Sequence, residues 1–157
     1  KADLDVALAI LDESGIPMRP SLLPFTPWTT LDDYLDLLRF VAERDLTEHI
    51  DPVHFSIRLL VPPGSALLSD PTSAEWAGEL DEEAFTVRWS SPDSRLDELQ
   101  RHVAAIVERA ATDNEPLRKT FARIWDAAHA MAGTPRSIPE PRLKRPTPPR
   151  LTESWFC

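Results

Sequence analysis

Polar side chains alternate with apolar ones in two stretches of the sequence, and their types suit the binding of a polar or anionic ligand. In residues 53–61, Val-His-Phe-Ser-Ile-Arg-Leu-Leu-Val, a strand would turn its even-numbered residues to one face and its apolar odd-numbered residues to the other. Arginine on such a face can bind a carboxylate or another anionic group. The candidate contact residues are Arg19 and Ser21 in the first stretch, which begins at Ile16, and His54, Ser56 and Arg58 in the second, residues 53–61.

Both stretches belong to one unit, residues 16–65, which predicts a strand, a loop, a helix and a second strand. Two strands joined by a crossover helix are normally parallel, and the helix covers one face of the sheet. Since parallel strands are usually apolar on both faces, the polar face has two interpretations. It lines an open barrel that holds a polar ligand, or it is the wet face of an edge strand. Prolines 17, 20 and 24 each remove a ladder donor and predict a short or edge strand.

Helical periodicity is clearest in residues 31–44, where apolar residues recur at positions i, i+3, i+4 and i+7. Thr30 and Asp33 predict a capping box at its start, with Asp in place of the usual Glu or Gln. Similar apolar faces predict helices in residues 3–14, 94–110 and 116–133, and we expect the last two to form an antiparallel hairpin. Residues 84–89 are a candidate edge strand, within an acidic connector that covers residues 69–93.

The last segment, residues 134–157, is rich in proline and arginine and predicts extended structure rather than helix or strand. It carries five basic and two acidic residues, whereas the whole chain has a net charge of −9. Such a tail could fold back onto the acidic body or meet a partner, and the sequence favours a solvated tail over both. Its final residues, Ser154-Trp-Phe-Cys157, leave open whether the terminus docks or frays.

Composition excludes several classes of function. The net charge of −9 argues against a nucleic-acid-binding protein, because phosphate contacts require clustered basic residues. The sequence has no apolar run long enough for a membrane helix and no signal peptide, so we expect a cytoplasmic protein. One cysteine provides neither an internal disulfide nor a Cys/His metal site. His102 and His129 are expected to pack or to lie at the surface, and no catalytic set of residues can be singled out.

Three segments together resemble the C-terminal part of a radical SAM protein. They are Phe25-Thr-Pro-Trp-Thr-Thr30, Asp51-Pro-Val-His-Phe-Ser-Ile-Arg-Leu-Leu-Val-Pro-Pro-Gly-Ser65 and Pro149-Arg-Leu-Thr-Glu-Ser-Trp-Phe-Cys157. The group resembled has chains that end in Cys-Sec-Ala-Glu-Pro or Cys-Cys-Ala-Glu-Pro. The resemblance implies an α/β fold: residues 1–68 as the last strands and helices of a partial (β/α) barrel, then the helical hairpin 94–133 and the extended tail 134–157.

The resemblance also implies chemistry. A [4Fe-4S] cluster would reduce S-adenosylmethionine to a radical that abstracts hydrogen from a substrate, a small molecule or a peptide. Arg19, Ser21, His54, Ser56 and Arg58 would face the cavity, with Arg58 the best candidate for an anionic group. The Cys-x3-Cys-x2-Cys motif that holds the cluster is absent, so this chain alone binds neither cofactor. The motif and the N-terminal part of the barrel would lie upstream, since the chain begins Lys-Ala-Asp like a piece of a longer protein.

Cys157 is the candidate redox residue. In the group resembled, the tail continues with selenocysteine or cysteine, so an in-frame UGA read as a stop would end the chain at this position. Adjacent sulfur and selenium atoms would form a redox-active pair. Two alternatives require no radical chemistry: a non-catalytic α/β binding or interaction module, and a helical-hairpin adaptor whose proline-rich tail recruits partners.

Overall fold

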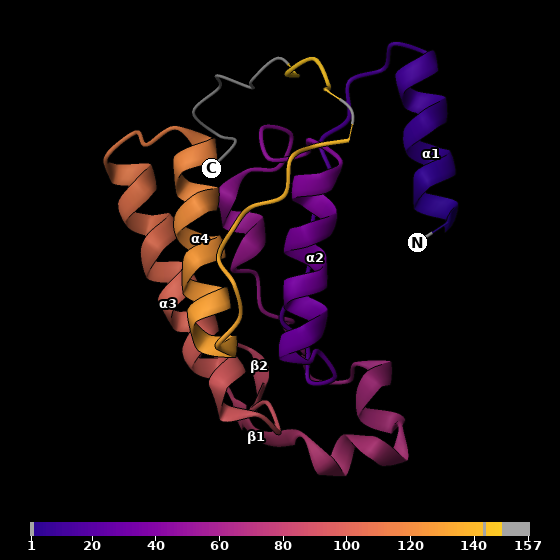
Figure 1. Ribbon diagram of the computed structural model, residues 1–157. Helices are drawn as coiled ribbons and strands as arrows, with labels where there is room; N and C mark the ends of the chain where they lie inside the picture. The colour runs from indigo at the N-terminus through magenta and orange to yellow at the C-terminus, as the bar shows by residue number, and fades with distance from the viewer. Residues whose placement is uncertain (1, 143, 149–157) are drawn as a thin grey trace.

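The computed structural model describes residues 2–142 and 144–148, and within them the chain is predominantly helical (Figure 1). Helices α3 and α4 lie side by side, α2 packs against α4, and α1 stands at the periphery. The elements are α1 Ala2–Glu13, α2 Leu31–Glu43, the 3-10 helices η1 Pro52–Phe55, η2 Ala66–Ser69 and η3 Pro71–Glu75, the strands β1 Ala77–Asp81 and β2 Thr86–Trp89, and the helices α3 Ser94–Thr112 and α4 Leu117–Ala132.

The expected partial barrel is wrong. In the part of the chain that the structure describes, the sheet has two strands, β1 and β2, which pair antiparallel. The predicted second strand fails at its start, where Pro52 opens η1 and Ser56 donates from its backbone N–H to the carbonyl of Val53 at 3.0 Å. This local hydrogen bond replaces the alternating geometry of a strand, so the even-numbered residues of 53–61 do not share a face.

One short parallel contact remains from the predicted strand–helix–strand unit. Phe25 donates to the carbonyl of Ile57 at 3.2 Å and accepts from the N–H of Leu59 at 2.8 Å, and this bridge is parallel. Upstream of Phe25 the prolines lack the donors that would extend the pairing, so residues 16–22 form no strand. Farther along, Val61 accepts from Val87 at 2.7 Å and thereby joins this segment to β2.

Helix α2 forms as its sequence predicts. The side chain of Thr30 accepts from the N–H of Asp33, and the Asp33 carboxylate accepts from the Thr30 backbone, which completes the capping box. Tyr34 on its buried face stacks near Phe25, with ring centroids 4.9 Å apart, and donates its hydroxyl to the carbonyl of Phe55 at 2.9 Å. Helix α2 therefore fixes the segments on both sides of it.

The helices predicted in residues 94–110 and 116–133 are also confirmed, as α3 and α4. Their core residues follow the predicted faces, with Leu99, Val103 and Ile124 fully buried between the helices and the rest of the core. Gly133 ends α4 at φ +66°, a left-handed conformation that glycine adopts without a steric penalty. No helix within residues 2–142 and 144–148 is both long enough and apolar enough to cross a membrane.

The tail does not simply extend into solvent. We call residues 139–148 the strap, of which 143 lies outside the described residues; it runs along α2 toward α1 (Figure 1). Its Arg142 donates a backbone N–H to the carbonyl of Glu43 at 2.8 Å and pairs with the Glu43 carboxylate at 2.9 Å. Arg145 donates to Asp45 and to the carbonyl of Arg44. The expectation of a solvated tail is therefore wrong for this part of it.

Asp45 connects three elements and should make stability depend on pH. Burial opposes ionisation of this carboxyl, but the backbone N–H of Arg145 and the side chain of Arg118 outweigh it, so the pKa of Asp45 lies below its usual value. A depressed folded-state pKa stabilises the protein above the unfolded-state pKa, about 4, and this contribution is lost as the pH falls through the lower folded-state value.

We therefore expect Asp45→Asn to cost about 1–2 kcal/mol near pH 7 and progressively less as the pH drops below about 4, because the wild type then loses the same interaction. Urea unfolding followed by circular dichroism at several pH values measures the difference. Asp126→Asn, at an exposed carboxylate of α4, is the control and should leave stability near its wild-type value. A penalty for Asp45→Asn that stays constant as the pH falls contradicts the assignment.

Candidate functional site

The five candidate contact residues occupy different places in the folded chain. Ser21 is exposed and lines an apolar groove of about 450 Å³ between α1 and α2. The hydroxyl of Ser56 donates to the carbonyl of Val53 at 2.9 Å and so helps to close η1. The two serines therefore lie in different environments, and the common polar face expected from strand alternation does not form.

Arg58 is held by protein groups. Its guanidinium lies 3.5 Å from the centre of the Trp89 ring, pairs with Asp97 at 2.6 Å and donates to the carbonyl of Trp89. A planar guanidinium combines stacking with several donated hydrogen bonds, which a lysine cannot do. Arg58 thus connects the segment after η1 to the end of β2 and to the first turns of α3, and its donors are directed at protein acceptors.

His54 lies on the wall of a cavity of about 600 Å³ between η1, the end of α3 and the start of α4. The ring atom Nδ1 is buried and has no hydrogen-bond partner within the described part of the chain. Such an atom is uncommon, because buried polar groups are normally paired with protein or water. Asp51 also lines the cavity, and Arg19 approaches Asp51 to 3.4 Å, so two of the candidate residues lie at or near this cavity.

Glu115 is the most strongly held acidic group in the wall of the His54 cavity. Its carboxylate accepts from the hydroxyl of Thr120 at 3.0 Å and pairs with Lys119 at 3.1 Å and Arg123 at 3.2 Å. Burial opposes ionisation, but these donors outweigh it and lower the pKa of Glu115 below its usual value. The carboxylate is therefore ionised at neutral pH and serves mainly to secure the first turn of α4.

The lining of the cavity is suited to binding a small ligand. The His54 ring offers hydrogen-bonding nitrogens, and Asn114 adds a side-chain amide to the lining. The remaining wall is apolar, so a small ligand with an apolar part and one or two hydrogen-bonding groups fits it best. The apolar wall residues are Val53, Ile57, Val107, Ala110, Ala111 and Leu117.

No group of three or more His, Cys, Asp or Glu side chains that could hold a metal occurs within residues 2–142 and 144–148. The candidate redox residue, Cys157, lies outside the described residues. Two further histidines match the expected roles: His102 is exposed on α3, whereas His129 is buried, stacks on Trp125 and shares a hydrogen bond with its carbonyl at 2.9 Å.

Sequence reasoning missed three residues that shape these sites. Asp97, the partner of Arg58, is 39 positions away in the sequence, and no local pattern connects them. Trp89 was expected only as the end of a strand. Glu115 lies one residue before the helix predicted in residues 116–133, and its i+4 spacing from Lys119 is a pattern that helix geometry makes readable.

Comparisons with known proteins identified no relative of this chain. No family model matches the sequence, and neither the curated proteins nor the solved structures contain a match. The resemblance to radical SAM proteins therefore depends on the quoted residues alone.

Proposed function

We propose that this chain is the C-terminal module of a radical SAM enzyme, with the His54 cavity as a ligand-binding surface of that module. The module supplies binding groups and packing, and the chemistry on S-adenosylmethionine belongs to the rest of the enzyme. The substrate would be a small molecule or a peptide end whose hydrogen-bonding group meets His54.

The observation that carries this proposal is the parallel contact across α2. Phe25 exchanges two backbone hydrogen bonds with Ile57 and Leu59, and the intervening helix packs Tyr34 against Phe25. The contact is a single bridge and forms no sheet. Both paired segments belong to the stretches that resemble radical SAM proteins, and their contact in the folded chain supports treating those stretches as one unit of the proposed module.

The residues of this chain do not fit an iron–sulfur cluster. A [4Fe-4S] cluster is held by cysteine thiolates, and the sequence contains one cysteine, at position 157. In the proposed enzyme, the cluster would therefore be bound by residues outside this chain.

The complete reading frame tests the proposal. We expect a Cys-x3-Cys-x2-Cys motif upstream of codon 1, and the full protein purified without oxygen should contain iron and sulfide and release 5′-deoxyadenosine from S-adenosylmethionine on reduction. The control is the same protein with the three motif cysteines replaced by alanine, which should release none. A reading frame without the motif overturns the proposal, and a codon after 157 other than TGA or a cysteine codon overturns the redox-tail assignment.

The second candidate, a non-catalytic binding module, is favoured by the closed core. Buried residues of α2, α3, α4 and β2 form one continuous apolar cluster within the described residues. A chain that buries its own core needs no missing barrel strands to fold. The same reading frame separates the candidates, since a module of this kind requires no upstream cysteine motif.

A further inference from the structure

The C-terminal end of α2 and the residues that follow it carry several carboxylates and backbone carbonyls that accept hydrogen bonds. The last carbonyls of an α-helix have no partner inside the helix, and the helix dipole places partial negative charge there. Three carboxylates add to this charge around the helix end, and Asp45 is only 7% exposed. Two cations offset part of it: Arg118 pairs with Asp45 and Glu48, both at 3.1 Å, and Arg44 lies 3.9 Å from Glu43 while pairing with Asp5. The acceptors are the carbonyls of Glu43 and Arg44 and the carboxylates of Glu43, Asp45 and Glu48.

The strap binds this surface in the manner of an extended peptide. Two backbone N–H groups three residues apart donate to it, from Arg142 to the Glu43 carbonyl at 2.8 Å and from Arg145 to the Asp45 carboxylate at 3.0 Å. The Arg145 side chain donates through Nε to the Arg44 carbonyl at 2.8 Å and pairs with Asp12 of α1. Farther along, Thr147 donates its hydroxyl to Glu48 at 3.0 Å.

These contacts select arginine rather than positive charge alone. Arg145 satisfies a carbonyl and a carboxylate at once through different nitrogens of one planar group, which a lysine ammonium cannot reproduce in that geometry. Prolines at 141 and 146 flank the two arginines and favour an extended backbone before binding. The recognition pattern is therefore an extended segment with the sequence Arg-x-x-Arg.

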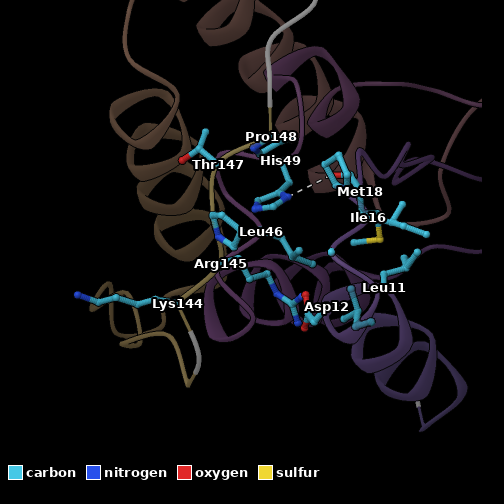
Figure 2. A pocket seen from close by; sticks show the side chains of 14 residues that line it. Leu11, Asp12, Ile16, Met18, Leu46, His49, Lys144, Arg145, Thr147 and Pro148 are labelled. Atoms are coloured by element: carbon cyan, nitrogen blue, oxygen red, sulfur yellow. Dashed lines mark hydrogen bonds and ion pairs between the residues drawn. The ribbon is translucent and has the colours of Figure 1, made fainter.

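The strap is attached mainly by polar contacts, and of its described residues only Pro148 is buried, although the Arg145 side chain is also just 9% exposed. A cavity of about 340 Å³ lies between the strap, α1 and the segment before α2, and Figure 2 shows Arg145 reaching Asp12 at its edge. Residues 134–138, which connect α4 to the strap, are all exposed. A segment held in this way can leave its site without disturbing the core.

We propose that the end of α2 is a docking site for extended Arg-x-x-Arg peptides, and that the strap is its intramolecular occupant. A peptide in trans competes with the strap, whose tether gives it a high effective concentration, of the order of mM for a short flexible connection. The proposal does not depend on the proposed enzymatic function.

The test uses the full chain with Arg142→Ala and Arg145→Ala, which frees the site, and a fluorescent peptide of residues 138–148. Fluorescence anisotropy at low salt should show saturable binding to this variant and at least tenfold weaker binding to the wild-type chain, whose own strap competes. A peptide with lysine at both arginine positions has the same charge and should bind several-fold more weakly. Added NaCl should weaken binding, because the contacts are ionic and near the surface.

Three results overturn the proposal: no saturable binding to the variant, equal binding of the arginine and lysine peptides, or equal binding to variant and wild type. Circular dichroism first confirms that the variant keeps its helix content. Should it lose helix, the chain with Arg142→Lys and Arg145→Lys takes its place, and the peptide should bind it several-fold more tightly than the wild type, since its strap keeps the charge but lacks the planar groups.

Discussion

Phe55→Ala is expected to lower the free energy of unfolding by about 3–5 kcal/mol, the range measured for truncating a large buried aromatic residue. Phe55 is 1% exposed, and its ring meets that of Phe121 edge-on with centroids 5.5 Å apart. Its carbonyl also accepts the Tyr34 hydroxyl, so η1 is fixed against both α2 and α4. The truncation leaves a cavity at the point where these three elements meet. Denaturant unfolding followed by circular dichroism measures the loss.

Val53→Ala is the matched control. Strand alternation would place Val53 and Phe55 on the same buried face, whereas in η1 Val53 is 47% exposed. We expect this substitution to cost less than about 1 kcal/mol, because little apolar surface is lost. Comparable large losses for the two variants would contradict the 3-10 helix and restore the predicted strand.

Arg58→Ala is expected to cost about 2–3 kcal/mol, since it removes a stacked guanidinium together with hydrogen bonds to a carboxylate and a carbonyl. Arg58→Lys keeps the charge but loses the planar group, and we expect it to recover less than half of the loss. Arg39→Ala is the control: its partner Asp36 is 2.7 Å away, but both side chains are about half exposed, so the cost should be about 0.5 kcal/mol.

A double-mutant cycle with Asp97→Ala isolates the ion pair within this cluster. We expect an interaction energy of about 1–2 kcal/mol between positions 58 and 97 from equilibrium unfolding of the four proteins. If Arg58 instead served mainly to bind an anionic ligand, Arg58→Ala would leave stability near the wild-type value. That outcome would contradict the structural role described above.

Local signals in the sequence identified the helices well. The i, i+3, i+4, i+7 pattern of residues 31–44 and the Thr30–Asp33 capping box correspond to α2, and Gly133 marks the end of α4. Such signals act within one or two turns of the chain, so neighbouring residues suffice to read them. The candidate strand in residues 84–89 likewise corresponds to β2.

The partial barrel failed because alternation of polar and apolar residues is not specific to a strand. Residues 53–61 do not form a strand because Pro52 opens a 3-10 turn and the hydrogen bonds of Ser56 close it. Upstream, prolines limit the pairing to Phe25. These effects depend on backbone donors and acceptors, which a hydrophobicity pattern does not record.

The site and the strap depend on contacts between distant residues. Arg58 meets Asp97 across 39 positions, and Arg145 meets Asp45 across 100. The opposite charges of tail and body made a contact between them conceivable from the sequence. The acceptors at the end of α2 become visible only once that helix and its neighbours are placed.

The attachment of α1 has a consequence for the order in which the protein opens. Leu8 is the only residue of α1 in the buried core within the described chain, and ion pairs of Asp5 with Arg44 and of Asp12 with Arg145 hold the helix at its two ends. Partly exposed ion pairs contribute little and are screened by salt. We therefore expect helix α1 to unfold locally, with fast amide exchange, while α2, α3 and α4 remain intact.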